Sequence, residues 1–223
     1  MEENITSIEA FVEEQLERWK EAHKKKEDPL VYTVITLSME PGSGGCFVAE
    51  KVAERLGFGF FHRDIVQGIA KSAHRSEQLI NTLERERLSG VEDFISSVIR
   101  EKYLYPGTYQ RHLMKVVSAI ADHGKAVIVG RGANFILPAE RRLSVRVIAP
   151  LEDRIRNICR QFKVKEDKAR RRVLKRESAR RAFVRQTFHV DISDPAHYDM
   201  VINTAKMDID SAVAAIVGAA RHG

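Results

Sequence analysis

The residues best suited to chemistry form the cluster Gly-Ser-Gly-Gly at positions 42–45. An apolar run rich in β-branched residues, 31–37, precedes this cluster, and a segment with helical periodicity follows it at 47–56. A strand, a glycine loop and a helix in this order can bind phosphate. The glycines let backbone N–H groups approach the anion, and the helix N-terminus attracts negative charge. We therefore predict a phosphate-binding glycine loop at residues 38–46.

The glycine loop departs from the strict phosphate-loop pattern, G-x-x-x-x-G-K-[ST]. If Gly44 is the second glycine of that pattern, Met39 replaces the first glycine and Gly45 replaces the lysine. Cys46 then replaces the hydroxyl residue that would hold Mg²⁺. Cys46 is interpreted either as a redox-sensitive thiol at a helix N-terminus or as a small loop residue. The loop has the shape expected for phosphate binding but lacks the usual side chains.

A second candidate for anion binding is Arg131, which lies between two glycines after the apolar run 126–129. An arginine at the carboxyl end of a central strand can hold an anion with two parallel hydrogen bonds. The alternative is that Arg131 caps the helix that follows it. We favour anion binding.

The run 57–61 is followed by three polar residues, His62, Arg63 and Asp64. Open α/β sheets place ligands at the carboxyl ends of their strands, where these residues are expected. Asp64 could orient a nucleotide hydroxyl, or it could cap the helical segment 65–73. His62 is more simply a surface histidine in a turn than a base or a ligand.

Positive charge is concentrated between residues 154 and 185. This block holds fourteen Lys and Arg residues against three acids, so its net charge is +11, whereas the whole chain carries +6. A protein that coats nucleic acid usually spreads its positive charge over an extended face. A compact block beside a phosphate loop fits a small polyanion such as a nucleotide, although a solvated helix face is the simpler alternative for any single arginine.

The composition is that of an ordinary soluble protein: 223 residues, 43% hydrophobic and 30% charged. No apolar run approaches the roughly 20 residues that span a bilayer, and the acidic N-terminus does not resemble a secretory signal. The two cysteines, Cys46 and Cys159, lack metal-ligand spacing and favour a cytoplasmic location. His189, Asp191 and Asp194 match no ligand pattern either, so we predict an ordered loop there and no metal held by the protein.

Five apolar runs alternate with helical segments; the runs are residues 31–37, 57–61, 126–129, 143–149 and 198–203. This alternation predicts an α/β fold with a parallel sheet, right-handed crossovers and helices on both faces. Helical periodicity covers residues 47–56, 65–73, 76–87, 91–102, 109–123, 151–162, 164–185 and 209–220. We divide the chain into an amphipathic helical arm at 1–28, which could join two copies as a homodimer, and one domain at 30–223.

Several motifs in their order resemble the cytidylate kinase-like family, a branch of the P-loop nucleoside monophosphate kinases. They are the glycine loop and the segments 61–64, 127–137, 149–156 and 194–204. The resemblance runs from about residue 31 to the C-terminus. It implies a five-stranded parallel sheet of order 2-3-1-4-5, a helical acceptor-binding region at about 65–123 and an arginine-rich lid at about 163–190.

The resemblance implies transfer of the γ-phosphoryl group of ATP, with Mg²⁺, to a pyrimidine nucleoside monophosphate, CMP or dCMP. The catalytic residues that it implies are Arg131, Arg176 and Arg180. The ATP-binding residues that it implies are Gly42, Ser43, Gly44, Gly45, Cys46 and Arg172. The acceptor-binding residues that it implies are Arg63, Asp64, Arg131 and Glu177. Phosphoryl transfer needs positioning and positive charge more than covalent chemistry, and lid arginines that close over the substrates would supply that charge.

The sequence departs from the family's pattern, which commonly has arginines at the positions of Met39 and Cys46 and an aspartate at that of His62. Groups that stabilise charge in this way are worth roughly 10²–10³ in rate, unless Arg63 or the lid arginines compensate. We therefore weigh a cytidylate-type kinase against a nucleotide-binding regulator with little turnover, and against a kinase of another small acceptor. Nucleic-acid binding ranks last, because aromatic residues do not interleave with the basic block.

Overall fold

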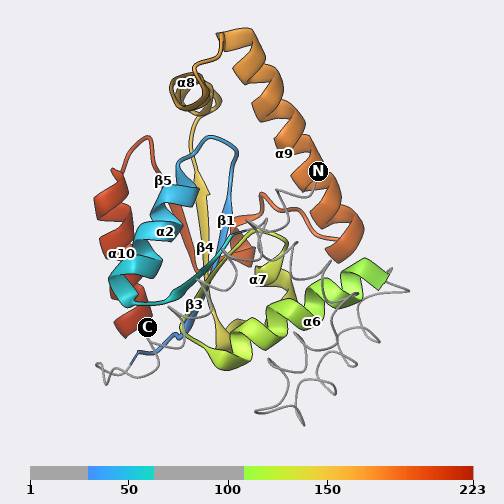
Figure 1. Ribbon diagram of the computed structural model, residues 1–223, viewed down its shortest axis with the longest axis vertical. Coiled ribbons are helices and arrows are strands. Elements are labelled where there is room, and N and C mark those ends of the chain that lie inside the picture. Colours follow the sequence, from blue (N-terminus) through green and yellow to red (C-terminus); the bar gives the residue numbers. More distant parts are fainter. Residues whose placement is uncertain (1–29, 63–107, 223) are drawn as a thin grey trace, which may run out of the picture.

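The computed structural model describes residues 30–62 and 108–222. The predicted arm at 1–28, the helical segments predicted between 65 and 102, and the predicted site residues Arg63 and Asp64 lie outside the described residues. In the described part, a central sheet is flanked by helices on both faces, and a pair of helices extends beyond one end of the sheet (Figure 1).

The sheet has five parallel strands in the order β2-β3-β1-β4-β5, as the family resemblance implied. The strands are β1 (Val34–Met39), β2 (Gly59–Phe61), β3 (Ala126–Val129), β4 (Leu143–Ile148) and β5 (Met200–Asn203). β1 lies in the middle, so the segment that follows it leaves the sheet at its centre. Val129 of β3 pairs with Leu37 of β1, and Val147 of β4 pairs with Met39. The carboxyl ends of these three strands therefore meet at one edge.

The described helices are α2 (Gly45–Leu56), α6 (Thr108–His123), α7 (Ala133–Ile136), α8 (Leu151–Phe162), α9 (Glu166–Phe188) and α10 (Ile209–His222). Two short 3₁₀ segments, η1 (Ala139–Arg141) and η2 (Pro195–His197), were not predicted. α2 and α10 lie on one face of the sheet, and α6 and α7 lie on the other (Figure 1). The described part contains no helix that is both long enough and apolar enough to cross a membrane.

Both faces of the sheet are buried, which explains why its strands are continuous apolar runs. Ile35 and Leu37 of β1 pack in a core with α2 and α10. Val34 of the same strand and Ile128 of β3 pack in a second core with α6 and α7. Successive strand residues point to opposite faces, so each core receives alternate residues of the same runs.

β1 begins three residues later than predicted. The N–H of Tyr32 donates to the carbonyl of Ala220 at the end of α10, and this bond takes the first residues of the apolar run out of the sheet. α9 ends three residues beyond the predicted segment 164–185, because Val184 and Phe188 are buried against the core. Apolar periodicity therefore continues past the arginine-rich part of the helix.

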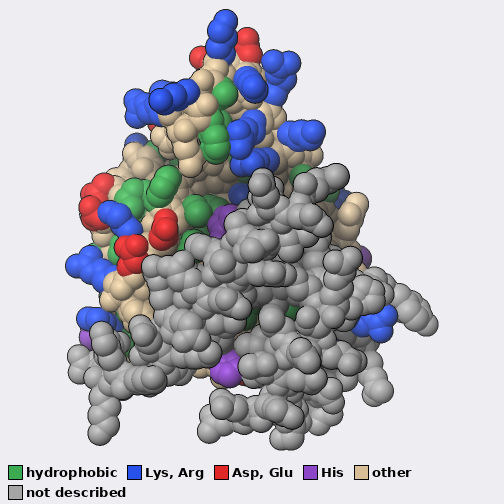
Figure 2. Space-filling view, viewed as in Figure 1, with side chains coloured by type: hydrophobic (Ala, Val, Ile, Leu, Met, Phe, Trp, Pro, Cys, Tyr) green, Lys and Arg blue, Asp and Glu red, His purple; other side chains and the backbone are tan. Residues whose placement is uncertain are grey.

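α8 and α9 form a helical hairpin at one end of the molecule. A small cluster that includes Ile155, Ile158 and Val173 holds the two helices together. Lys and Arg side chains gather on this hairpin (Figure 2). The basic block thus lies on α8 and α9, and the first turn of α9 carries two acids, Glu166 and Asp167, that suit the positive end of its dipole.

Candidate functional site

The glycine loop turns between β1 and α2 at the carboxyl edge of the sheet, as predicted. The N–H of Ser43 donates to the carbonyl of Glu40 at 3.1 Å and closes the turn. Gly44, with φ of +78°, is the N-cap residue of α2 and has no side chain to cap the helix. The first N–H groups of an α-helix point toward the turn that precedes it. In α2 the N–H of Phe47 already donates to the carbonyl of Gly44 at 3.0 Å. An anion at this point would meet backbone donors and the positive end of α2.

Two glycines are required by close contacts. A Cβ atom on Gly42, whose φ is +85°, would lie 2.5 Å from the carbonyl oxygen of Arg154 in α8. A Cβ atom on Gly45 would lie 2.6 Å from the Cβ of Met39 and 3.1 Å from the Cβ of Val147. The position of the usual lysine therefore has no room for a side chain. Met39 occupies the space into which it would extend.

Neighbouring elements hold the carbonyl groups of the glycine loop. The hydroxyl of Thr204, after β5, donates to the carbonyl of Ser43 at 2.6 Å. The amide of Asn157 in α8 donates to the carbonyl of Gly42 at 2.9 Å. These bonds occupy two carbonyl acceptors of the turn and tie it to α8 and to the segment after β5.

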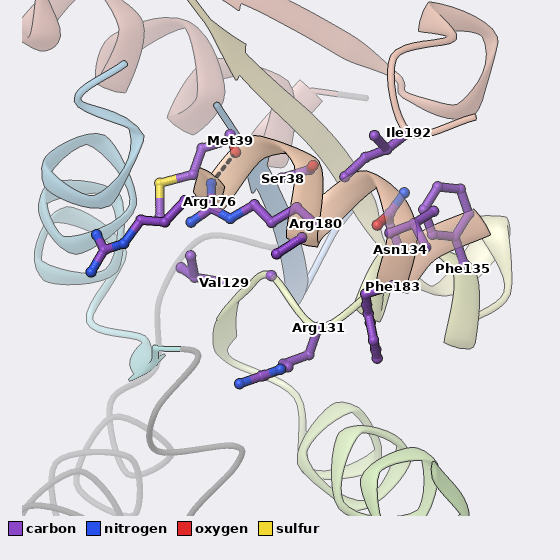
Figure 3. Close-up of a pocket in the computed structure, with 14 residues that line it drawn as sticks. Ser38, Met39, Val129, Arg131, Asn134, Phe135, Arg176, Arg180, Phe183 and Ile192 are labelled. Atoms are coloured by element: carbon purple, nitrogen blue, oxygen red, sulfur yellow. Dashed lines mark hydrogen bonds between the residues drawn. The ribbon is translucent and has the colours of Figure 1, made fainter. Parts of the chain in front are cut away.

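α9 brings two of the predicted catalytic arginines to the end of β1. Arg176 and Arg180 are four residues apart, so they lie on one face of the helix. A guanidinium nitrogen of Arg180 donates to the carbonyl of Met39 at 2.5 Å. Both side chains line a cavity of about 180 Å³ that also includes Met39 and Ser38 at the end of β1 (Figure 3). We call it the arginine cavity.

Arg131 reaches the arginine cavity from the segment after β3. Gly130, Arg131 and Gly132 all have positive φ, at +77°, +55° and +70°. A positive φ is uncommon for a residue with a side chain, and such backbone strain clusters at functional sites. The N-cap residue of α7 is Gly132, not Arg131. The alternative that Arg131 caps the following helix is therefore wrong, and the arginine extends separately from those of α9 (Figure 3).

The rest of the arginine cavity is largely apolar. Phe135 of α7, Phe183 and Val184 of α9, and Ile192 line it. The cavity thus combines cationic groups with an apolar wall. This combination suits a ligand with an anionic end and a flat or apolar body.

Two other predicted site residues, Arg172 and Glu177, contact side chains of α8 and α9 and do not both line the arginine cavity. The guanidinium of Arg172 stacks over the ring of Phe162, 3.8 Å from its centroid, within the hairpin. The carboxylate of Glu177 contacts Arg154 at 3.0 Å and Arg181 at 3.2 Å. Their predicted roles in ligand binding stay predictions. Cys46 is half-buried in the first turn of α2.

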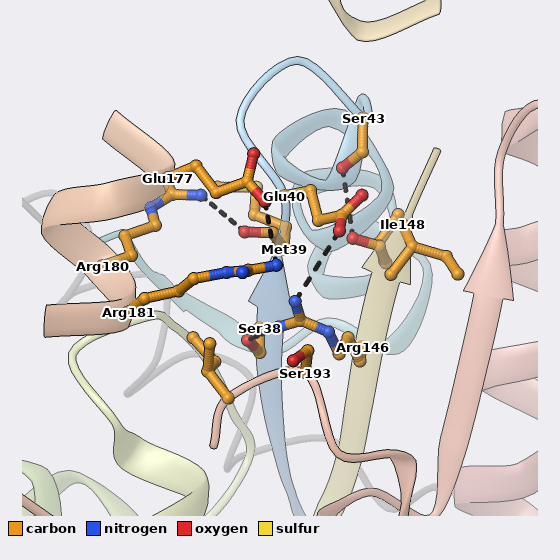
Figure 4. A network of polar contacts seen from close by, with 12 residues as sticks. Ser38, Met39, Glu40, Ser43, Arg146, Ile148, Glu177, Arg180, Arg181 and Ser193 are labelled. Carbon is orange, nitrogen blue, oxygen red and sulfur yellow. Dashed lines mark hydrogen bonds and ion pairs between the residues drawn. The ribbon is translucent and has the colours of Figure 1, made fainter. Parts of the chain in front are cut away.

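Three charged residues that connect the site, Glu40, Arg146 and Arg154, were not predicted from the sequence. The carboxylate of Glu40 lies 3.4 Å from Arg154. It lies 3.9 Å from Arg146, below it in Figure 4. It also accepts the N–H of Ala149 at 3.1 Å. Arg146 is buried in β4 and donates to the hydroxyl of Ser38 at 3.0 Å. A charge inside an otherwise apolar strand needs a buried partner, so Arg146 was a signal of this network.

The segment between α9 and β5 is ordered by local hydrogen bonds. Asp191 accepts bonds from the hydroxyl and the N–H of Ser193, and these bonds hold the pKa of Asp191 below its usual value. Asp194 caps η2 by accepting the N–H of Ala196. His189 ends α9 with a φ of +57°. Each of the three residues that raised the question of a metal thus has a local structural role.

Mg²⁺ takes oxygen ligands, usually carboxylates, phosphates and water. At the start of α2, Cys46 offers sulfur instead of a hydroxyl. The hydroxyl of Ser43 donates to the carbonyl of Val147 at 3.3 Å, and the carboxylate of Glu40 is engaged by two arginines. Across residues 30–62 and 108–222, no group of three or more His, Cys, Asp or Glu side chains could hold a metal ion. These residues do not fit direct coordination of Mg²⁺ at the glycine loop.

Comparison with known proteins places these features in a family. Residues 34–206 match the model of the cytidylate kinase-like family. A protein named cytidylate kinase from Methanocaldococcus jannaschii is 23% identical over 192 residues, which cover 79% of this chain and 91% of that protein. A protein of the same name from Ignicoccus hospitalis is 26% identical over 184 residues, which cover 82% of this chain and 96% of that protein.

A solved structure shares the fold. The crystal structure of an uncharacterized protein from Eubacterium ventriosum aligns with a TM-score of 0.58 at 20% sequence identity, and the alignment covers 83% of this chain and 96% of that one. Because the family model matches more than half of the sequence, the chain belongs to the cytidylate kinase-like family.

Proposed function

We propose that the protein transfers the γ-phosphoryl group of ATP to a nucleoside monophosphate of the cytidylate type, CMP or dCMP. The observation that supports this best is that three arginines from two separate elements line one cavity beside the glycine loop. The similar proteins named cytidylate kinase suggest the acceptor.

In this proposal the glycine loop binds the phosphates of ATP. The N–H groups at the start of α2 and the helix dipole supply the attraction, as at other helix N-termini. Mg²⁺ would reach the site on the phosphates of the nucleotide. The predicted contacts of Gly42, Ser43, Gly44 and Gly45 with ATP belong to this part of the proposal.

Arg131 holds the phosphate of the acceptor, and Arg176 and Arg180 neutralise the transferred group. Phosphoryl transfer needs the two substrates in line and positive charge on the transferred oxygens. Arg131 comes from the end of β3 and the other two come from α9, so the acceptor phosphate can lie between them. The apolar wall with Phe135 and Phe183 would face the nucleoside.

The second candidate is a nucleotide-binding regulator with little turnover. It is favoured by the side chains of the glycine loop, because Gly45 has no room for the usual lysine and Cys46 replaces the usual hydroxyl. A charged group that stabilises the transition state is worth roughly 10²–10³ in rate. The kinase proposal requires the arginines of α9 to make up this loss.

One pair of measurements tests both candidates. Calorimetry measures binding of ATP, CMP and dCMP, and a coupled assay measures ADP release with Mg²⁺. Turnover that depends on CMP or dCMP supports the kinase, whereas tight ATP binding without turnover supports the regulator. A chain that binds neither ATP nor CMP contradicts both. UMP, AMP and GMP serve as matched acceptors, and a rate that is highest with one of them overturns the cytidylate assignment alone.

A further inference from the structure

Five charged side chains of alternating sign run from the sheet to α9. They follow the order Arg146, Glu40, Arg154, Glu177 and Arg181. The successive nitrogen–oxygen distances are 3.9, 3.4, 3.0 and 3.2 Å. Figure 4 shows Glu40 above Arg146 and Glu177 beside Arg181. Glu40 belongs to the glycine loop and Glu177 to α9, so this chain of charges connects the two.

The middle of the chain of charges is buried. The side chain of Arg154 is 7% exposed and that of Arg146 is 6% exposed. Arg154 also donates from Nε to the carbonyl of Ala149 at 2.9 Å, which fixes its guanidinium plane. A buried guanidinium that loses one carboxylate must find another partner, because an uncompensated buried charge is strongly unfavourable. Arg154 contacts both Glu40 and Glu177, so a change at Glu40 would alter the environment of the Arg154–Glu177 pair.

The ion pair of Glu177 with Arg154 helps to orient α9, together with the buried side chains of Val173, Val184 and Phe188. Residues 177 and 181 lie on the face of the helix that meets Arg154. Residues 176 and 180 lie on the neighbouring face and line the arginine cavity. Because side chains of one helix are fixed relative to one another, holding Glu177 against Arg154 also directs Arg176 and Arg180. The bond from Arg180 to the carbonyl of Met39, next to Glu40, is made in this orientation.

We propose that Glu40 is a positioning residue that couples the glycine loop to α9 through Arg154 and Glu177. In this role its carboxylate acts through Arg146 and Arg154, which hold it, and not through contact with a substrate. It keeps the glycine loop and the arginines of α9 in one arrangement. Binding of a ligand at the glycine loop is then favoured when α9 is docked, and the docking of α9 is favoured when the loop is occupied. The part of this inference that concerns catalysis rests on the proposed function, and the coupling itself does not.

Hydrogen exchange measures the coupling without any nucleotide. A coupling free energy is reciprocal between its two sites. In Glu40→Gln we expect faster exchange of the amides of residues 174–182 in α9. In Glu177→Gln we expect faster exchange at residues 43–48, around the glycine loop and the start of α2. Amides of β3 and α10 serve as internal references and should keep their wild-type rates.

Glu152→Gln is the matched control. Glu152 also joins α8 to α9, through an exposed ion pair with Arg170 at 2.9 Å, but it has no connection to the glycine loop among the contacts of the described residues. This variant should leave exchange around the loop unchanged. Faster exchange confined to the element that carries each substitution overturns the proposal, and so does an equal effect of the control. If Glu40→Gln also speeds exchange at the reference amides, that variant has loosened the whole domain. The test then rests on Glu177→Gln, a change on a half-buried helix face, and on its effect at residues 43–48.

Kinetics then separates positioning from substrate contact. We expect Glu40→Gln to lower kcat by about ten- to hundredfold and to change the KM for ATP by less than about threefold. The double variant with Glu177→Gln should be no slower than the slower single variant, because both break one pathway. If the loss of kcat in the double variant equals the product of the two single losses, the proposed coupling is overturned. A wild-type chain without turnover defeats only the proposed function, and the exchange experiment still decides the coupling.

Discussion

The substitution Gly45→Ala gives the sharpest test of how the glycine loop is packed. Gly45 is buried at the first position of α2. A Cβ atom there would lie 2.6 Å from the Cβ of Met39, whereas carbon atoms in good contact are about 3.5–4.0 Å apart. The contact is with the first atom of the methionine side chain, which cannot swing away without moving β1. Val147 of β4, at 3.1 Å, blocks movement on another side.

Two effects of opposite sign decide the result. Alanine in place of glycine stabilises a helix by up to about 1 kcal/mol. Overpacking of a filled core costs about 1–3 kcal/mol, and a Cβ–Cβ overlap of roughly 1 Å belongs in the upper part of that range. We therefore expect a net loss of about 1–2 kcal/mol. For a chain of this length, this corresponds to a melting temperature lower by about 2–8 °C.

A mutant cycle followed by thermal or urea denaturation tests the argument. Met39→Ala retains the Cβ atom, so Gly45→Ala should remain destabilising in that background. Met39→Gly removes the Cβ atom, and there the same substitution should lose most of its cost, because only the 3.1 Å contact with Val147 remains. The reasoning is refuted if Gly45→Ala stabilises the wild-type chain. It is also refuted if Met39→Ala relieves the loss as completely as Met39→Gly does.

Three further outcomes are expected. Arg131→Ala should weaken CMP binding about 10- to 100-fold, the worth of a charge-assisted hydrogen bond, and ATP binding by less than threefold; equal losses by calorimetry would contradict its role. Gly42→Ala should destabilise the chain by about 2–4 kcal/mol in urea denaturation, because its φ is +85° and its Cβ would meet the carbonyl of Arg154. Asp208 accepts two bonds from Ser211, which lower the pKa of Asp208. The stabilising effect of Asp208 is therefore complete above the unfolded pKa of about 3.9. It is lost as pH falls through the lower pKa of the folded state. The difference in melting temperature between wild type and Asp208→Ala should therefore disappear in acid.

The strands of the sheet were predictable because each can be recognised from residues that are neighbours in the sequence. Each strand is an apolar run, and alternation with helices limits the topology to a few right-handed arrangements. The order of the strands came from the family resemblance, and the pairing of β1 with both β3 and β4 confirms it. The end of α9 was missed because Phe188 is buried by residues far away in the sequence, which periodicity in the arginine-rich segment does not reveal.

The site was predictable only in part. Glycine clusters and an arginine between glycines are visible in a sequence, and the structure brings Arg131, Arg176 and Arg180 to one cavity. The partners of charged residues are not visible in this way. Glu40 and Arg146 are 106 positions apart, so only the register of β1 and β4 brings them together. Two predicted residues, Arg63 and Asp64, lie outside the described part of the chain.

Met39 and Gly45 depend on each other: the side chain at position 39 fills the space that a side chain at position 45 would need. A lysine at position 45 would share the Cβ position of an alanine, so the methionine that replaces the first glycine of the pattern also excludes the lysine. The usual cation could not be restored at position 45 alone. In the proposed reaction, positive charge near the transferred phosphate would then come from α9, whose Arg180 already contacts the carbonyl of Met39. A cation on the glycine loop is present at all times, whereas one on a separate helix acts only when that helix is docked. In such a protein the chain of charges from Glu40 to Glu177 would control catalysis as directly as the loop itself.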